Sequence, residues 1–145
     1  MIRMVYPVEI THDTIDGGFT ATCRDLSEAL TQGATTPQAL LEAADAIEEA
    51  VASRIKRGID IPEPSVKKQG EYMVAVPLST SLKAALYLAM RDDNISKSEL
   101  ARRIGVDEKE VRRMLDPRYP SKTPALERAL SSLGRYVIAE FAKAA

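Results

Sequence analysis

The sequence predicts an α+β fold, in which a small β-β-β-α-β domain precedes a mainly helical domain. Apolar and polar residues alternate over residues 2–11 and 19–24, and Tyr72, Val74 and Val76 alternate with Met73 and Ala75, which is typical of strands buried on one face. Residues 36–57 instead place apolar side chains every three or four positions, as in an amphipathic helix. Helical spacing dominates after Ser79, so we expect two domains, at 1–79 and 80–145.

The first two predicted strands form a hairpin. Residues 2–11 alternate in polarity, and Pro7 favours an edge strand because proline cannot donate a ladder hydrogen bond. Asp16-Gly17-Gly18 is a typical turn, and residues 19–24 alternate again. A short third strand is expected at 29–32.

One long helix follows the third strand. Thr36 and Pro37 are expected at its cap and first turn, where a proline has no helical hydrogen bond to lose, and Gly58 is expected to end it. The residues predicted to form its apolar stripe are Leu40, Ala44, Ile47, Val51 and Ile55. The acids of the opposite face are Glu42, Asp45, Glu48 and Glu49. Such a face is either simply solvated or meets a basic partner.

A connector and a fourth strand complete the first domain. Residues 59–70 combine two prolines with charged residues, which predicts an irregular connector across the sheet. The alternation at 72–76 predicts a strand that joins the same sheet, because a lone strand is not stable. The first domain then has one helix on one face of a small sheet.

Residues 96–116 carry the spacing of a helix-turn-helix. Gly105 supplies a tight turn, and the small Ala101 lets two helices approach closely. Ser96 and Asp107 each stand three residues before a glutamate, which is the capping-box pattern of a helix start. The residues predicted to face inward are Leu100, Ile104, Val106, Val111 and Met114. The alternative interpretation is an ordinary helical hairpin with a solvated charged face.

Two further helices must supply apolar surface, because two short helices do not make a core alone. The first ends near Asn94, and its apolar residues are Leu82, Ala85, Leu86, Ala89 and Met90. The second opens at Thr123 and Pro124 and stops near Gly134. The alternating residues 135–141, RYVIAEF, are expected to add a strand or a dimer contact.

The net charge of −1 conceals an asymmetry between the two domains. Residues 1–79 contain 7 lysines and arginines against 12 acids, a net charge of −5, and residues 80–145 contain 13 against 9, a net charge of +4. This split favours nucleic acid as partner of the second domain and a basic partner for the first, although small domains commonly carry charges of this size. We expect a cytoplasmic protein with no membrane partner, because no apolar run is long enough for a span and the N-terminus lacks a signal-peptide pattern.

The candidate DNA-contacting residues all come from the helical domain. Its second short helix turns Glu108, Lys109, Arg112 and Arg113 to solvent, a surface suited to a major groove. Of these, Lys109 and Arg113 are predicted to reach base edges. The residues predicted to meet phosphates or flank the groove are Arg112, Ser98, Lys97, Arg118 and Lys122. Arg102 and Arg103 are further candidates for contacts to the DNA backbone, unless one of them pairs with a nearby acid.

Catalysis is not expected, and neither is a cofactor or a metal site. Metal-dependent phosphodiester cleavage needs several converging carboxylates. The acids near the predicted strands are Glu9, Asp13, Asp16 and Asp25, and three of them stand by turns, where aspartate is common for backbone reasons. No motif supports His12 and Cys23 as a nucleophilic dyad, and the single cysteine is interpreted as a small buried hydrophobe.

Several short segments, in order along nearly the whole chain, resemble the HicB family of antitoxins from bacterial toxin–antitoxin pairs. They are Gly17-Gly18-Phe19, Asp25-Leu26, Ala29-Leu30-Thr31-Gln32-Gly33, Ile61-Pro62-Glu63-Pro64-Ser65, Val76-Pro77-Leu78-Ser79 and Glu99-Leu100-Ala101-Arg102-Arg103-Ile104-Gly105. The family often has Phe-Pro before the aspartate and Pro-Gly after the leucine, where this chain has Cys23-Arg24 and Ser27-Glu28. That departure concerns the shape of one loop, not the resemblance.

The resemblance implies a reduced ribonuclease-H-like first domain that binds a small basic HicA-type toxin with a double-stranded-RNA-binding fold and masks its RNA-cleaving histidine. It implies that the second domain represses its own operon, with the toxin as co-repressor or titrant. Operator symmetry implies a homodimer or a dimer of dimers, because two recognition helices must reach major grooves about 34 Å apart. A stand-alone regulator whose first domain senses a small ligand, and a metal-dependent nuclease, are the alternatives.

Overall fold

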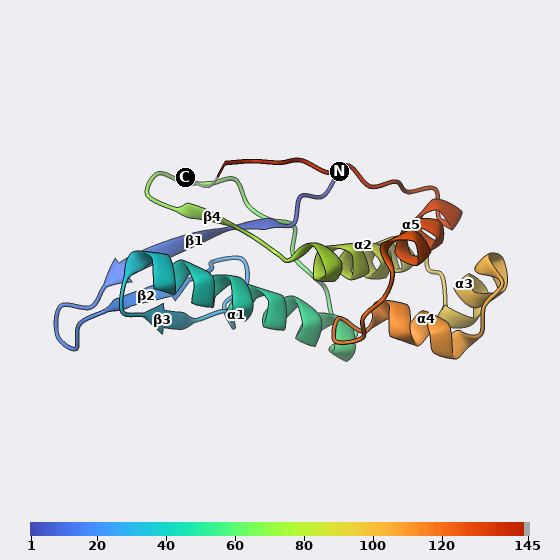
Figure 1. The fold of residues 1–145 in the computed structure, drawn as a ribbon, viewed down its shortest axis with the longest axis horizontal. Helices are drawn as coiled ribbons and strands as arrows, with labels where there is room; N and C mark the ends of the chain where they lie inside the picture. The colour runs from blue at the N-terminus through green and yellow to red at the C-terminus, as the bar shows by residue number, and fades with distance from the viewer. Residues whose placement is uncertain (144–145) are drawn as a thin grey trace. The chain divides into compact units, whose positions relative to one another are not determined.

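The computed structural model describes residues 1–143, and its internal contacts divide the chain into two compact units, Met1–Pro77 and Leu78–Ala145. We call them the N-terminal unit and the C-terminal unit. The N-terminal unit contains an antiparallel sheet and a helix, whereas the C-terminal unit contains only helices as regular elements among the described residues (Figure 1). The predicted α+β class, with a mostly helical second half, is confirmed.

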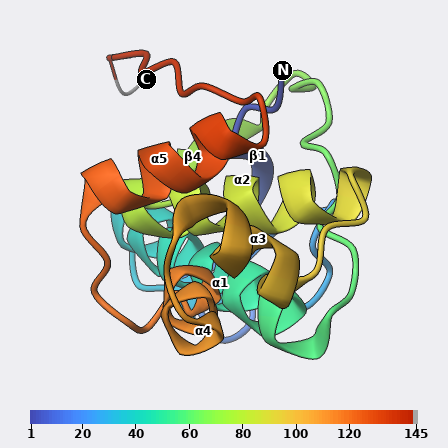
Figure 2. The same cartoon turned by 90° about the vertical axis from the view of Figure 1, so that its right-hand side faces the viewer.

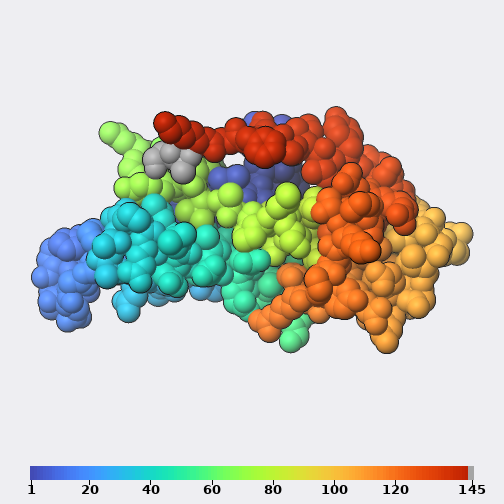
Figure 3. Space-filling model, viewed as in Figure 1, coloured from blue at the N-terminus to red at the C-terminus, as the bar shows by residue number. Residues whose placement is uncertain are grey.

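The sheet has four antiparallel strands in the order β3-β2-β1-β4. The strands are β1 (Val5–His12), β2 (Phe19–Thr22), β3 (Thr31–Gly33) and β4 (Tyr72–Ala75), and the helix α1 (Thr36–Arg57) lies between β3 and β4 in the sequence. The predicted order β-β-β-α-β is therefore confirmed, although β3 begins two residues later than expected. The turn at 13–18, coloured blue, projects from the end of the β1–β2 hairpin (Figure 3).

β1 is a central strand, so the prediction that Pro7 marks an edge strand is wrong. The first half of β1, residues 5–8, pairs with β4, and the second half, residues 9–12, pairs with β2. Pro7 lies opposite Met73 of β4, in the half of β1 that β2 does not accompany. On the side facing away from β4, the missing N–H of Pro7 therefore costs the sheet no hydrogen bond.

α1 begins one residue earlier than expected and ends where expected. The N-cap is Thr35 rather than Thr36, because the Thr35 hydroxyl accepts a hydrogen bond from the Gln38 N–H at 3.2 Å. Pro37 lies in the first turn, as predicted. Gly58 ends the helix with a left-handed φ of 68°, a conformation that favours glycine.

The first half of α1 turns a different face to the sheet than predicted. Ala39 and Ala43 are buried, whereas Leu40 and Ala44 are only half-buried. The cause is the close approach of β3, because a Cβ on Gly33 would lie 2.5 Å from the backbone nitrogen of Ala39. The residues of the second half that are buried as predicted are Ile47, Val51 and Ile55.

The connector at 59–71 has no regular secondary structure, yet hydrogen bonds fix its backbone to the sheet. The buried Tyr6 hydroxyl donates to the Pro62 carbonyl at 2.7 Å. Burial raises the pKa of this hydroxyl, which keeps it a donor. Ser65 donates its N–H at 2.8 Å and its hydroxyl at 2.5 Å to the Asp25 carboxylate. The connector is therefore a fixed part of the N-terminal unit.

The C-terminal unit contains α2 (Leu78–Asp92), α3 (Lys97–Ile104), α4 (Glu108–Leu115) and α5 (Thr123–Ser132). α3 and α4 lie side by side, and both α2 and α5 contact this pair (Figure 2). α2 ends at Asp92, two residues before the expected end near Asn94, and Asn94 has a left-handed φ of 52°. Each of the four helices contributes to the core at least one side chain that is at most 1% exposed. Examples, in the order of the helices, are Leu86, Leu100, Val111 and Leu126.

The chain leaves α5 through Gly134, which has a left-handed φ of 71°, as expected of a helix stop. The strand considered for residues 135–141 is not present in the structure. Instead, the segment leaves apolar side chains in solvent, among them Tyr136, Ile138 and Phe141. Within residues 1–143, no helix is long and apolar enough to cross a membrane.

Candidate functional site

α3, α4 and the turn at 105–107 form the centre of the candidate site. The Ser96 hydroxyl accepts a hydrogen bond from the Glu99 N–H at 3.1 Å, and the Asp107 carboxylate accepts one from the Glu110 N–H at 2.8 Å. Gly105, between the helices, has a left-handed φ of 71°. The predicted caps and the predicted turn are therefore confirmed.

The apolar side of this helix pair is buried, mostly as predicted. The buried members are Leu100, Ala101, Val111 and Met114, whose exposed fractions are 6% or less. Ile104 and Val106 are only half-buried, because they flank the exposed turn. With its apolar side fixed in the core, α4 is left with its polar side in solvent.

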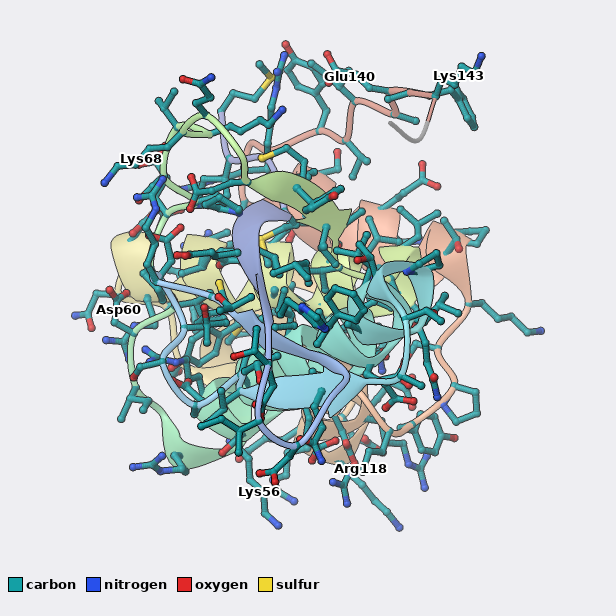
Figure 4. All side chains as sticks on the ribbon, turned by 90° about the vertical axis from the view of Figure 1, so that its left-hand side faces the viewer. Lys56, Asp60, Lys68, Arg118, Glu140 and Lys143 are labelled. Carbon is teal, nitrogen blue, oxygen red and sulfur yellow. The ribbon has the colours of Figure 1, made fainter. Side chains whose placement is uncertain are left out.

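The eight candidate DNA-contacting residues all reach the surface of the C-terminal unit. The exposed ones are Lys97, Ser98, Lys109, Arg112, Arg118 and Lys122, and the half-buried ones are Glu108 and Arg113. They come from the start of α3, from α4 and from the loop after α4. Arg118, on that loop, lies at the surface (Figure 4).

The two arginines of α4 are paired with acids of the same helix. Arg112 lies 3.0 Å from Glu108, and Arg113 lies 3.5 Å from Glu110. The Ser98 hydroxyl also donates to Glu108, at 3.3 Å. Exposed pairs of this kind contribute only a few tenths of a kcal/mol, about 0.3–0.5, so another anion can replace the carboxylate at low cost.

Both arginines of α3 pair with the same acid, although the sequence suggested that only one would. Glu99 accepts from Arg102 at 2.5 Å and from Arg103 at 3.0 Å. Hydrogen bonds from Arg102, and then from Arg103, lower the pKa of the Glu99 carboxyl. α3 therefore turns its arginines toward its own first turn.

Three lysines of the candidate set have no carboxylate partner. Within residues 1–143, no ion pair involves Lys97, Lys109 or Lys122. Their ammonium groups are exposed at the start of α3, on α4 and before α5. The candidate site can therefore offer several positive charges to a polyanion.

Two residues of this region, Lys83 and Tyr119, were not predicted from the sequence to contribute to it. Lys83 of α2 is fully buried, and its ammonium group lies among oxygen atoms of residues 113–121. Helical spacing is the signal that points to it, because Lys83 precedes the buried Leu86 and Met90 by three and seven positions. The second is Tyr119, whose ring centroid lies 5.3 Å from the Arg113 guanidinium. Nothing in the local sequence indicates that contact.

The outward face of α1 is the most acidic candidate surface of the N-terminal unit. Glu42, Asp45 and Glu49 are exposed, and Glu48 is half-buried. Leu41 lies beside them with 71% of its surface exposed. The face combines negative charge with an apolar side chain, as protein-binding surfaces often do.

The first residues considered for catalysis serve the hairpin turn. The Asp13 carboxylate accepts hydrogen bonds from the Ile15 N–H at 2.9 Å and the Asp16 N–H at 3.1 Å, and these bonds lower its pKa. The His12 ring stacks on Phe19 with 4.8 Å between ring centroids. Both arrangements stabilise the hairpin locally.

The other residues considered for catalysis are not gathered into a site. The Asp25 carboxylate binds Ser65, and Glu9 is exposed on β1. Cys23 is 3% exposed, and burial raises the pKa of its thiol, which disfavours the reactive thiolate. Among residues 1–143, no group of three or more histidines, cysteines and acids could hold a metal ion.

A small hollow opens beside the end of β2. It is lined by Glu9, Thr22, Cys23, Arg24, Ser27, Leu30 and Glu71, and its volume is 280 Å³. The Arg24 guanidinium and the Glu71 carboxylate form an ion pair in its wall, 2.9 Å apart. Small-molecule sites typically measure about 300–1,000 Å³, so this hollow is small for a ligand-sensing role.

Comparison with known proteins gives one family for both units. Residues 5–85 match the family described as the HicB-like antitoxin of bacterial toxin–antitoxin systems. Antitoxin HicB of Escherichia coli strain K12 is 35% identical over 132 residues, which cover 91% of this chain and 95% of that protein. Antitoxin HicB 2 of Photorhabdus laumondii is 35% identical over 135 residues, which cover 93% and 94%.

A more distant relative agrees with these two. Antitoxin HicB of Pseudomonas fluorescens is 31% identical over 138 residues, which cover 94% of this chain and 93% of that protein. In each of the three relatives the similarity extends over nearly the full length of both proteins. The chain therefore belongs to the HicB-like antitoxin family of bacterial toxin–antitoxin systems.

Proposed function

We propose that this antitoxin neutralises a HicA-type, mRNA-cleaving toxin by direct binding and represses its own operon by binding operator DNA. The similarity to antitoxins along 91% of the chain carries the proposal. The net charges support the division of labour, because residues 1–77 carry −5 and residues 78–145 carry +4. In this proposal the N-terminal unit is a reduced ribonuclease-H-like domain that binds the toxin and cleaves nothing.

Co-expression tests the neutralisation. The proposal predicts that a neighbouring gene encodes a small basic protein. This protein is expressed alone and together with the full antitoxin, and growth and copurification are measured. We expect the neighbour to arrest growth alone, and the antitoxin to restore growth and to copurify with it. A neighbour that is neither bound nor detoxified overturns the antitoxin part of the proposal.

The acidic face of α1 is the surface that we assign to the toxin. Glu42, Asp45 and Glu49 recur at helical spacing, so one side of α1 presents three exposed carboxylates beside the exposed Leu41. Carboxylates arranged in this way attract a basic protein and steer its approach. The apolar side chain gives the interface an anchor that excludes water.

Charge reversal on this face is expected to weaken toxin binding by about 10- to 100-fold, because like charges then face each other across the interface. The variant is D45K/E49K, and calorimetric titration of the purified toxin gives the affinity. Glu63→Lys, at an exposed position of the connector, is the matched control and should bind like the wild type. Equal affinities of all three proteins would remove α1 from the interface.

We assign α3 and α4 to a helix-turn-helix, with α4 as the recognition helix. We assign base-edge contacts to Lys109 and Arg113 of α4. The other candidates lie on α3, on α4 itself and on the loop after α4. The exposed apolar segment 136–141 supports a dimer, since such residues gain stability when a second chain covers them. A dimer, or a dimer of dimers, presents two recognition helices to a symmetric operator.

Arg113→Ala is expected to weaken operator binding by about 1–3 kcal/mol, because a bidentate contact between arginine and guanine contributes that much to base discrimination. A gel-shift titration with the DNA upstream of the operon measures it. Arg57→Ala removes the same charge from the exposed end of α1 and should leave the affinity unchanged. An unchanged affinity for Arg113→Ala would exclude this residue from the site.

A further inference from the structure

The ammonium group of Lys83 is the most unusual polar feature of the C-terminal unit. Lys83 is 0% exposed. Its Nζ donates to the backbone oxygens of Arg113 at 2.9 Å, of Asp116 at 2.6 Å and of Tyr119 at 2.6 Å. It also lies 2.9 Å from the hydroxyl oxygen of Ser121. All four oxygens belong to the end of α4 and the loop that follows it.

A buried lysine at this position lowers the stability of the unit unless its ammonium group makes interactions that an apolar side chain cannot make. Lys83 lies between Leu82 and Ala84 on the buried part of α2, where a methionine of similar length would fill the space. Burying an ammonium group carries a desolvation penalty, and hydrogen bonds must offset it. Here three of the four partner oxygens come from the loop after α4, so the ammonium group determines the path of that loop.

The loop fixed in this way carries one candidate DNA contact, Arg118, and leads directly to a second, Lys122. Arg118 is exposed on it, and the Arg118 N–H donates to the Asp116 carboxylate at 3.0 Å. Lys122 is exposed at its end, just before α5. The Tyr119 ring lies beneath the guanidinium of Arg113, at 5.3 Å. The loop therefore connects the end of α4 to two exposed cations.

We propose that Lys83 is a positioning residue for operator binding, although it does not touch DNA. By fixing residues 116–121 from beneath, Lys83 holds Arg118 and Lys122 where both meet the phosphate backbone. It also keeps an aromatic ring under Arg113, so that the arginine stays directed along α4. This inference rests on the proposed DNA binding of the C-terminal unit.

The test compares Lys83→Met with the wild type in full-length protein. Operator affinity is measured by fluorescence anisotropy at several salt concentrations. We expect Lys83→Met to bind about 10- to 100-fold more weakly. The slope of log K against log salt should fall by about two for each bound protomer, hence by about four for a dimer, because each phosphate contact contributes about 0.9. The double variant R118A/K122A should lose the same slope, and adding Lys83→Met to it should change the slope little further.

Controls separate positioning from general damage. Lys56→Met removes an exposed lysine from α1 and should leave both affinity and slope unchanged. Thermal unfolding shows whether Lys83→Met is folded. If Lys83→Met is unfolded, Ser121→Ala takes its place as the test, because it removes one of the four oxygens around the ammonium group. We expect Ser121→Ala to weaken operator binding about 2- to 5-fold at an unchanged unfolding temperature.

The outcomes distinguish this inference from the proposed function. A wild-type chain that does not bind its upstream DNA overturns both. If the wild type binds and a folded Lys83→Met binds with the same affinity and slope, the inference alone is overturned. If Lys83→Met is unfolded, an unchanged affinity and slope for Ser121→Ala overturns it in the same way.

Discussion

Replacing Gly33 with alanine is expected to lower the free energy of unfolding of the N-terminal unit by about 3 kcal/mol. The added Cβ would lie 2.5 Å from the backbone nitrogen of Ala39 and 2.8 Å from its Cα. Both atoms belong to the backbone of α1, so neither can move aside like the end of a flexible side chain. The only relief is to separate β3 from α1, which opens the core between sheet and helix.

Chemical denaturation of the full chain measures this loss, with toxin binding as a second readout. Gly17→Ala is the matched control, because its Cβ would meet nothing within 4 Å. Gly17 has a φ of 77°, so the control should still cost about 1 kcal/mol through backbone strain. A Gly33 variant no less stable than the Gly17 variant would contradict the close packing of β3 on α1. Operator binding by the C-terminal unit should survive both substitutions.

Leu100→Ala is expected to have the reciprocal effect, with loss of operator binding and retention of toxin binding. Leu100 is 0% exposed in α3, and α3 contacts both α4 and α5. Truncating a buried leucine costs about 2–5 kcal/mol through lost burial and the cavity left behind. A domain of this size rarely has more than about 3–5 kcal/mol of stability, so most of the C-terminal unit should unfold.

Gel-shift and calorimetric titrations on the same preparation measure the two activities of the Leu100 variant. Leu78→Ala is the matched control, because it makes the same change in the same unit at a position that is 66% exposed. Its stability should stay within about 0.5 kcal/mol of the wild type. Normal operator affinity in the Leu100→Ala chain would show that the packing of α3 does not support DNA binding. Loss of toxin binding as well would show that the units are not independent.

Features that depend on neighbouring residues could be predicted from the sequence. Ser96 and Asp107 cap their helices as expected, and Gly105 and Gly58 adopt the left-handed conformations expected where helices end. Each depends on a hydrogen bond or a backbone angle within a few residues, so local spacing contains the necessary information. The alternation that predicts the strands is local in the same sense.

Features that depend on distant residues could not be predicted in this way. Pro7 is compatible with a central strand because β2 stops short of it, which is a matter of register rather than composition. Ala39 rather than Leu40 faces the sheet because Gly33 brings the two backbones together. The stripe predicted from helical spacing was therefore one position out in the first half of α1.

The same distinction between local and distant features applies to the candidate site. Its eight residues could be chosen from the sequence because charge and helical spacing place them at the surface, and all eight reach it. The contacts that these side chains make with one another could not be predicted, because they depend on rotamers as well as on spacing. Arg112 pairs with Glu108, and Arg113 lies against Tyr119 as well as Glu110.

The sequence by itself determined the α+β class, the element order, the caps of α3 and α4 and the family of this protein, because these follow from local periodicity and short motifs. Only the tertiary structure decided what lies beneath α4. Lys83 and Ser121 are 38 positions apart, and only the fold brings the ammonium group to the oxygens of that loop. The physical reason is that a buried charge is stable only with its hydrogen-bond partners, and those partners exist only after distant segments have packed.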